Sequence, residues 1–383
     1  MSVTAAKGFQ AAGIAAGIKQ SGNPDLALVV NRGPRLAAAG VFTSNRVKAA
    51  PVLWSEQVLK GGLVSAVVLN SGGANACTGP KGFQDTHATA EKVAETLGLN
   101  AGEVAVASTG LIGVTLPMDK LLPGVETAAA QLSEHGGEKA AIAIKTTDTV
   151  HKTAVFEGEG WTVGGMAKGA GMLAPGLATM LVVLTTDADL DSEVLDKALR
   201  DATRVTFDRV DSDGCMSTND TVLLLASGAA EVAPEYAEFA HAVKVVCDDL
   251  GRQLIGDAEG ASKDIKVEVV NAASEADAVE VGRSIARNNL LKCAIHGEDP
   301  NWGRVLSAIG TTSAAFEPDR LNVAINGVWV CKNGSVGEDR DKVDMRYREV
   351  VVTADLAAGT ETATIWTNDL TADYVHENSA YSS

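Results

Sequence analysis

The sequence predicts a layered α+β fold, and three of its features support this class. Strand-like apolar runs and longer runs of helical periodicity both occur, but few strands follow the strand-helix alternation of a doubly wound parallel sheet. The 39 glycines and 4% aromatic residues indicate close backbone packing rather than an aromatic-rich binding face. At 383 residues the chain exceeds the usual domain size of roughly 100–150 residues, so two domains are expected.

Strands are expected where short runs rich in Val, Ile and Leu lie between turn residues. These runs cover residues 26–30, 64–69, 104–107, 178–184, 222–226, 265–270, 321–330 and 350–354. Helices are expected where apolar residues recur every three or four positions, at residues 88–97, 125–132, 192–202, 236–255 and 276–288. Ser192 is a candidate N-cap, and Gly256 is a candidate helix stop.

A polar stretch at residues 256–264 is the best candidate for a domain boundary, since the sequence shows no internal repeat and no low-complexity segment. We therefore expect a main α+β domain over residues 1–262. A smaller C-terminal α/β domain is expected over residues 263–383.

Charge and cysteine usage narrow the partners and the compartment. The net charge of -17 repels nucleic-acid phosphates and anionic membranes, and no apolar run approaches the roughly 18 residues of a membrane span. Five cysteines without a Cys-x-x-Cys pair are typical of reduced thiols in the cytoplasm. The histidines lack paired spacing, and a calcium loop with Gly214 at its sixth position would have the cation Arg209 as its first ligand, so no metal is expected.

The bond between Ala178 and Thr179 is the most informative position for chemistry. It lies in a loop rich in glycine and proline that leads into a buried strand. A threonine hydroxyl needs a nearby base before it attacks a carbonyl, and a cut before Thr179 would supply its own α-amine, whose pKa is ordinarily about 7.7–8.0. Thr179 is therefore a candidate nucleophile, while the alternative interpretation is that it simply opens a core strand.

Several further motifs occur in a fixed order along the chain. They are Gly-Val-Phe-Thr-Ser-Asn at 40–45, Asn-Ser-Gly-Gly-Ala-Asn-Ala-Cys-Thr-Gly at 70–79, Ser-Thr-Gly at 108–110, Lys-Gly-Ala-Gly-Met-Leu-Ala-Pro-Gly-Leu-Ala-Thr at 168–179, Ser-Thr-Asn-Asp-Thr at 217–221, Gly-Glu-Asp-Pro-Asn-Trp-Gly-Arg at 297–304 and the closing segment 369–378. Together they resemble the blocks of the ornithine acetyltransferase family, the glutamate N-acetyltransferases of arginine biosynthesis. The resemblance extends over nearly the whole chain.

The resemblance implies a self-processing fold layered α/β/β/α and a role for each matching residue. Thr179 would be the nucleophile after cleavage between Ala178 and Thr179, giving chains 1–178 and 179–383. Thr109 and Gly110 match the oxyanion hole, in which a hydroxyl and a backbone N–H point at one developing charge. Lys168 matches a substrate-binding lysine.

The remaining matches concern substrate binding. Thr147 matches a substrate-binding threonine, although Thr146 is an open alternative. Glu259 matches an active-site glutamate that either holds a substrate ammonium or shuttles a proton, and Asp257 is its competitor. Asn378 and the terminal Ser383 match residues of a C-terminal tail that folds back over the substrate.

The activity implied is transfer of acetyl from N2-acetyl-L-ornithine to L-glutamate through an acetyl-threonine intermediate. No cofactor is implied, but acetyl-CoA is an additional candidate donor. Each precursor would give one chain of each kind, and two of each are expected to assemble. The rival interpretations are a self-processing aminopeptidase or amidase, an uncleaved non-enzymatic relative, and a secondary-metabolism acetyltransferase with a wider acceptor range.

Overall fold

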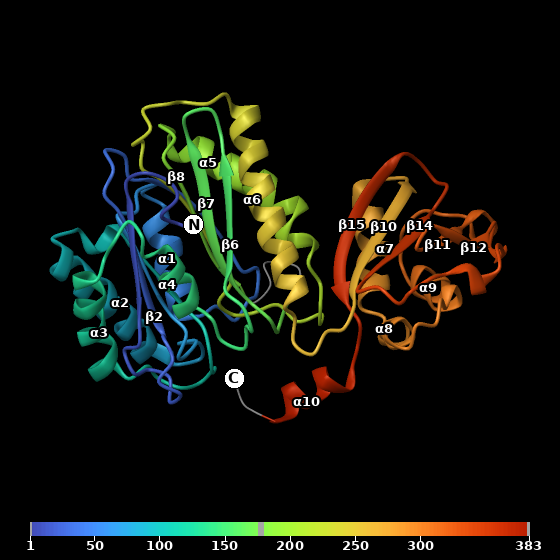
Figure 1. Ribbon diagram of the computed structural model, residues 1–383, viewed down its shortest axis with the longest axis horizontal. Helices are drawn as coiled ribbons and strands as arrows, with labels where there is room; N and C mark the ends of the chain where they lie inside the picture. Colours follow the sequence, from blue (N-terminus) through green and yellow to red (C-terminus); the bar gives the residue numbers. More distant parts are fainter. Residues whose placement is uncertain (1, 175–179, 381–383) are drawn as a thin grey trace. The chain divides into compact units, whose positions relative to one another are not determined.

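The computed structural model describes residues 2–174 and 180–380. The chain forms two compact units (Figure 1). Unit 1 contains residues 2–208 and 215–257, and unit 2 contains residues 209–214 and 258–380 of the described chain. The domain boundary expected between residues 262 and 263 stays a prediction.

The first sheet of unit 1 has the strand order β1-β2-β4-β5. Its strands are β1 (Phe9–Ile14), β2 (Leu26–Asn31), β4 (Ala66–Asn70) and β5 (Val104–Ser108), and only the pair β4 and β5 is parallel within this sheet. Helices α2 (Gly79–Leu97) and α3 (Met118–Ala130) pack on one face. Because β2 is buried on both faces, every one of its residues is inaccessible, which explains its continuous apolar run.

The second sheet of unit 1 has the strand order β3-β9-β8-β7-β6. Its strands are β3 (Ala37–Phe42), β6 (Lys152–Glu157), β7 (Thr162–Lys168), β8 (Leu181–Thr186) and β9 (Thr221–Ala226). The pair β8 and β9 is parallel, and the other pairs are antiparallel. Helices α5 (Ser192–Val205) and α6 (Tyr236–Gly256) pack against this sheet (Figure 1).

A shared apolar core joins the two sheets of unit 1. It contains side chains from β1, β2, β4 and β5 together with side chains from β7, β8 and β9. Helix α1 (Ala50–Leu59) contributes Val58 to the same core, and α4 (Gly137–Ala143) contributes three alanines that are followed directly by Ile144. The predicted layered α+β class is confirmed, with α1 and α4 added to the inner layer between the sheets.

Unit 2 is built on one mixed sheet of strand order β13-β12-β11-β14-β10-β15. Its strands are β10 (Asp264–Ala272), β11 (Asn322–Ile325), β12 (Val328–Lys332), β13 (Ser335–Val336), β14 (Glu349–Asp355) and β15 (Glu361–Asn368). Helices α7 (Glu275–Ala286), α8 (Asn289–His296) and α9 (Trp302–Ile309) share the apolar core of this sheet. The last helix is α10 (Ala372–Ala380).

The single strand predicted for residues 321–330 is wrong, because this segment is a hairpin. Asn326 and Gly327 have φ angles of 46° and 82°, and Ile325 pairs with Val328 across them. A two-residue turn with positive φ at both positions favours Asn-Gly, so the sequence contained the signal for a turn here.

The predicted N-cap of α5 is also wrong by one residue. Asp191 is the cap, and its carboxylate accepts the backbone N–H of Val194 at 3.0 Å. A carboxylate is favoured there because the N-terminus of a helix carries partial positive charge. The predicted stop at Gly256 agrees with α6, whose last residue is Gly256.

Two further properties concern the whole described chain. All five cysteines are free thiols, of which Cys247 and Cys331 are buried. Within residues 2–174 and 180–380, no helix is both long and apolar enough to cross a membrane.

Candidate active site

Thr109 and Gly110 lie where β5 ends in unit 1. The Thr109 N–H donates to the Asn70 carbonyl at 2.9 Å, so the strand's ladder continues one residue beyond Ser108, and Thr109 is buried. Gly110 has a φ of +130°, and a Cβ on it would lie 2.8 Å from the Gly73 nitrogen. Only glycine fits this backbone without strain, so the sequence of this turn is fixed by its geometry.

Lys168 ends β7 and points its buried side chain toward the same place. Its Nζ lies 3.4 Å from the Thr109 hydroxyl oxygen, and the residue is only 2% exposed. The structure therefore brings together two of the predicted site residues that lie 59 positions apart. A buried ammonium beside a hydroxyl favours negative charge on any atom bound between them.

A buried carboxylate missed from the sequence, Asp148, organises this corner of unit 1. One of its oxygens accepts the Lys152 ammonium and the Gly169 N–H, both at 2.7 Å, and the other accepts the Thr146 N–H at 2.9 Å. Burial alone would raise the pKa of Asp148, but nearby Lys168 and Lys152 together with the hydrogen bonds hold it well below its usual value. Asp148 is therefore a charged group at neutral pH.

The structure does not decide which of Thr146 and Thr147 is the substrate-binding threonine. Residues 145–150 form a loop of bends after α4 rather than an extended segment, so strict alternation of side chains does not apply. Both threonines are partly buried, and the Thr146 hydroxyl lies 3.5 Å from Asp148 Oδ2. The assignment of Thr147 to substrate binding stays a prediction.

Lys19 adds a further cation near this corner. Its Nζ donates to the carbonyl oxygens of Lys145 at 2.6 Å and Pro24 at 3.1 Å. Burial and the nearby Lys168 lower its pKa, whereas Asp25 and Asp148 act in the opposite direction. Sequence reasoning missed Lys19 because its place beside residue 145 depends on a contact across 126 positions.

The predicted cleavage residues Ala178 and Thr179 and the predicted contact residue Ser383 lie outside the described residues. The next residue, Met180, is buried, and its N–H donates to Asp220 Oδ1 at 3.1 Å. Its carbonyl oxygen accepts the Thr221 N–H at 3.1 Å. Both backbone groups of Met180 are thus fixed by the segment that enters β9.

Glu259 and Asn378 meet within unit 2. Glu259 lies in the turn after α6 and is buried, while Asn378 belongs to α10; the Asn378 amide donates to Glu259 Oε2 at 3.0 Å. The turn is fastened by Thr371, whose hydroxyl donates to the Gly260 carbonyl at 2.6 Å. The structure thus brings two of the predicted site residues, Glu259 and Asn378, into contact, while their roles in substrate binding stay a prediction.

Asp257, the competitor of Glu259, has a different environment within unit 1. Its carboxylate accepts the Lys152 ammonium at 2.6 Å and the Thr149 N–H at 3.1 Å. These bonds close the loop that leads into β6. The structure thus gives Asp257 a role in holding this loop.

A serine, a histidine and an aspartate also cluster in unit 2, but not as a hydrolytic triad. Ser262 Oγ and Asp369 Oδ2 both contact the same nitrogen, His296 Nδ1, at 3.2 and 2.9 Å. A triad needs the serine and the carboxylate on opposite ring nitrogens. The cluster instead joins the segment after Glu259 to the segment before α10.

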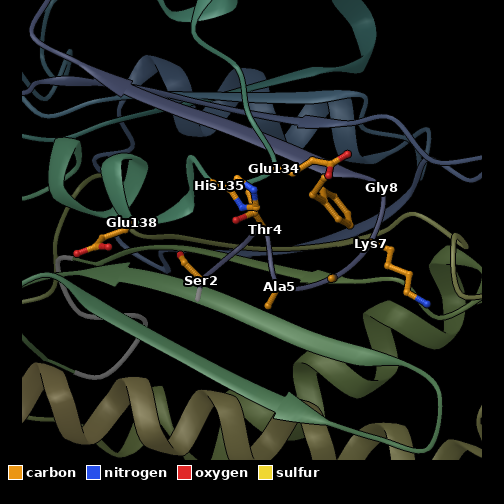
Figure 2. A pocket seen from close by; sticks show the side chains of 10 residues that line it. Ser2, Thr4, Ala5, Lys7, Gly8, Glu134, His135 and Glu138 are labelled. Carbon is orange, nitrogen blue, oxygen red and sulfur yellow. The ribbon is translucent and has the colours of Figure 1, made fainter.

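Unit 1 also has a surface cavity of about 460 Å³ beside its N-terminal segment, shown in Figure 2. Its lining includes Ser2, Lys7, Glu134, His135 and Glu138, and it contains none of the predicted site residues. Among the described residues, no group of three or more His, Cys, Asp or Glu side chains is arranged to hold a metal ion.

A hydroxyl, a glycine of positive φ and a buried ammonium at one corner form an arrangement suited to stabilising an oxyanion. Such an arrangement is typical of enzymes that transfer or cleave acyl groups. Thr109, Gly110 and Lys168 were found from sequence motifs, whereas Asp148 was missed and had only a weak signal, a carboxylate between two lysines in sequence.

Comparison with known proteins identifies the family. The sequence matches the ArgJ family over residues 10–383, so the chain belongs to the ArgJ family. An arginine biosynthesis bifunctional protein ArgJ from Streptomyces avermitilis is 88% identical over 383 residues, with all of both chains covered. The protein of that name from Thermobifida fusca is 65% identical over 382 residues and is also covered completely.

Solved structures with related sequences are known. An ornithine acetyltransferase from Mycobacterium tuberculosis, crystallised with ornithine, is 61% identical over 47% of this chain and 96% of its own, with a TM-score of 0.45. An arginine biosynthesis bifunctional protein ArgJ from Bacillus halodurans is 36% identical over 51% of this chain and 97% of its own, with a TM-score of 0.49.

Proposed function

We propose that the chain transfers acetyl from N2-acetyl-L-ornithine to L-glutamate through an acetyl ester on Thr179. The observation that supports this most strongly is the complete match to ArgJ proteins of arginine biosynthesis, at 88% and 65% identity. The chain is an acyltransferase of arginine biosynthesis, with ornithine acetyltransferase activity. The steps, the residues and the assembly described next are our proposal.

The reaction begins with the Thr179 hydroxyl attacking the acetyl carbonyl carbon. The hydroxyl proton passes to the α-amine of the same residue, and the carbonyl oxygen becomes an oxyanion held by the Thr109 hydroxyl and the Gly110 N–H. The C–N bond then breaks, ornithine leaves with the proton on its amine, and an acetyl ester remains on Thr179. The glutamate amine then attacks this ester, the C–O bond to Thr179 breaks, and the proton lost by the amine passes to the Thr179 oxygen, so N-acetylglutamate leaves and the hydroxyl is restored.

The described contacts support the assignment of charges. The Lys168 ammonium lies 3.4 Å from the Thr109 hydroxyl, which suits binding of a substrate carboxylate at that corner. Glu259, which bonds the Asn378 amide, either holds a substrate ammonium or returns a proton to the leaving amine. Thr147 is assigned to substrate binding on the family resemblance.

The proposal includes maturation and assembly. The precursor cleaves itself between Ala178 and Thr179, and the resulting chains 1–178 and 179–383 assemble as two of each. Asn378 and Ser383 are assigned to substrate binding on the family resemblance. We assign the protein to the cytoplasm and propose no cofactor, with acetyl-CoA as an alternative acetyl donor.

The test incubates purified protein with N2-acetylornithine, with and without glutamate, and measures N-acetylglutamate, ornithine and acetate. Acetyl transfer predicts N-acetylglutamate only when glutamate is present, with parallel lines in a two-substrate kinetic plot. Release of acetate at the same rate with or without glutamate would indicate an amidase and contradict the proposal. The same assay with acetyl-CoA as donor tests the second donor.

Thr179→Ala and Thr179→Ser provide the matched pair of variants. The alanine variant is expected to lose both self-cleavage and transfer, whereas the serine variant keeps a hydroxyl and retains part of each. Normal transfer by Thr179→Ala would refute the mechanism.

A further inference from the structure

Two consecutive residues before β9, Asn219 and Asp220, are buried and bond to Ser108 and Met180, which adjoin Thr109 and the predicted nucleophile in sequence. They are 3% and 0% exposed. The motif that contains them, residues 217–221, has no role in the proposed mechanism so far. Their side-chain bonds connect the end of β5 in the first sheet with the residue before β8 in the second sheet.

Asn219 braces the oxyanion segment. Its Nδ2 donates to the Ser108 carbonyl at 2.7 Å and to the Ala74 carbonyl at 2.6 Å. Its other amide atom, Oδ1, accepts the Thr218 hydroxyl at 2.6 Å. Because Ser108 directly precedes Thr109, these hydrogen bonds hold the backbone position of Thr109 and Gly110 at the end of β5.

Asp220 holds the backbone next to the predicted nucleophile. Its Oδ1 accepts the Met180 N–H at 3.1 Å, and Met180 directly follows the predicted nucleophile in sequence. The Thr221 N–H donates to the Met180 carbonyl at 3.1 Å, so the N–H and the carbonyl of Met180 are both held by this one segment.

The second carboxyl oxygen of Asp220 is buried and makes no hydrogen bond of good geometry within the described residues. Burial raises the pKa of Asp220 well above its usual value. The Met180 N–H, the Lys168 ammonium, the Thr43 hydroxyl and the Ser217 N–H act against burial without offsetting it. Burial thus disfavours the charged form of this carboxyl, since a charge removed from water is costly.

We propose that Asn219 and Asp220 form a positioning pair that sets the distance between the oxyanion hole and the nucleophile, in self-cleavage and in acetyl transfer. The inference rests on the proposed function, because it assumes that Thr179 and Thr109 act on one carbonyl group. Neither residue touches the substrate. Their effect is geometric, and a misplacement of about 1 Å between reacting groups is enough to slow an enzyme by roughly 10²-fold.

The structure offers a matched control for each residue. Asn31 makes the same pair of bonds at the other end of β9, donating to the carbonyl oxygens of Arg35 and Ala226, each at 3.0 Å. Asp187 is a buried carboxylate just after β8 that accepts the N–H groups of Lys7 at 3.0 Å and Thr162 at 2.7 Å. Alanine at these positions removes equivalent bonds away from the site.

The experiment uses the full-length precursor and compares Asn219→Ala, Asp220→Ala and Asp220→Asn with Asn31→Ala and Asp187→Ala. Cleavage is followed on denaturing gels, transfer by kcat and KM, and folding by thermal melting. Asn219→Ala and Asp220→Ala are expected to lower kcat and the cleavage rate by roughly 10²-fold with little change in KM. Asp220→Asn keeps a neutral acceptor for Met180 and is expected to retain both rates within about three-fold.

The control variants are expected to have lower melting temperatures than the wild type but the same kcat. The inference is overturned if Asp220→Ala cleaves and transfers at wild-type rates, if Asp220→Asn is as slow as Asp220→Ala, or if the controls lose kcat equally. Asp220→Asn also covers the case in which the alanine variant does not fold. Failure of the proposed function is distinguishable, because it would appear in the wild type as absent cleavage or absent N-acetylglutamate.

Discussion

Asp148→Asn tests the buried charge network beside the oxyanion corner. The side chains of Asp148 and Lys152 are both fully buried, and the carboxylate accepts two bonds of 2.7 Å and one of 2.9 Å. Asparagine has about the same size as aspartate, but it removes the charge and places an amide beside the ammonium groups of Lys152 and Lys168. Breaking a buried ion pair typically costs about 3–5 kcal/mol, a large part of a total stability of roughly 5–15 kcal/mol. At about 2–4 °C per kcal/mol, the melting temperature should fall by roughly 6–20 °C.

The pH dependence of this effect has a defined sign. The pKa of Asp148 is lowered in the folded protein, so its contribution is complete above the unfolded-state pKa near ~3.9 and is lost as pH falls from there toward the folded-state pKa. The stability difference between wild type and Asp148→Asn should therefore be constant from neutral pH to about pH 5 and shrink below about pH 4.

Denaturant unfolding across this pH range is the assay, with Asp196→Asn as the control. Asp196 pairs with Arg200 at 2.8 Å, but both side chains are exposed, so the control should lose only about 0.2–1 kcal/mol. A loss below about 1 kcal/mol for Asp148→Asn, or a difference that persists unchanged to pH 2, would refute this account of the network.

Three further predictions concern the site and the thiols. Gly110→Ala should lower kcat by roughly 10²–10³-fold, because its Cβ would meet the Gly73 backbone at 2.8 Å; Gly113→Ala, also at positive φ but with no atom within 4 Å, should affect only stability. Thr109→Val keeps the shape and removes the hydroxyl, so kcat should also fall by about 10²-fold at nearly constant KM, and an unchanged kcat would exclude the hydroxyl from the oxyanion hole. Burial raises the pKa of the Cys247 and Cys331 thiols, so a thiol reagent should modify only the exposed cysteines of the folded protein, Cys77, Cys215 and Cys293.

Much of the fold follows from local sequence patterns where strands are buried on both faces. The runs at β2, β5 and β9 read as continuous apolar segments because both faces of each strand are covered. The hairpin of β6 and β7 was missed, since Gly164 and Gly165 interrupt the apolar pattern and two lysines, Lys152 and Lys168, are buried within these strands. Buried lysines look like surface residues in sequence until their carboxylate partners are known.

The site residues also divide into those that local sequence motifs reveal and those that only tertiary contacts reveal. Thr109, Gly110 and Lys168 belong to motifs, so resemblance located them, and the structure adds that two of them meet. Asp148 and Asp220 were not identified, because their partners are set by tertiary contacts. Asp220 reaches Met180 only through the parallel pairing of β8 and β9, across 40 positions. No spacing rule in sequence encodes such a contact.

The most direct test of the central claim is intact-mass analysis of active enzyme, alone and after a short incubation with N2-acetylornithine. We expect two fragments, one of which begins at Thr179, and the addition of one acetyl group to that fragment's terminal residue when glutamate is absent. Active protein that remains a single chain, or that transfers acetyl without any adduct on the Thr179 fragment, would contradict the mechanism.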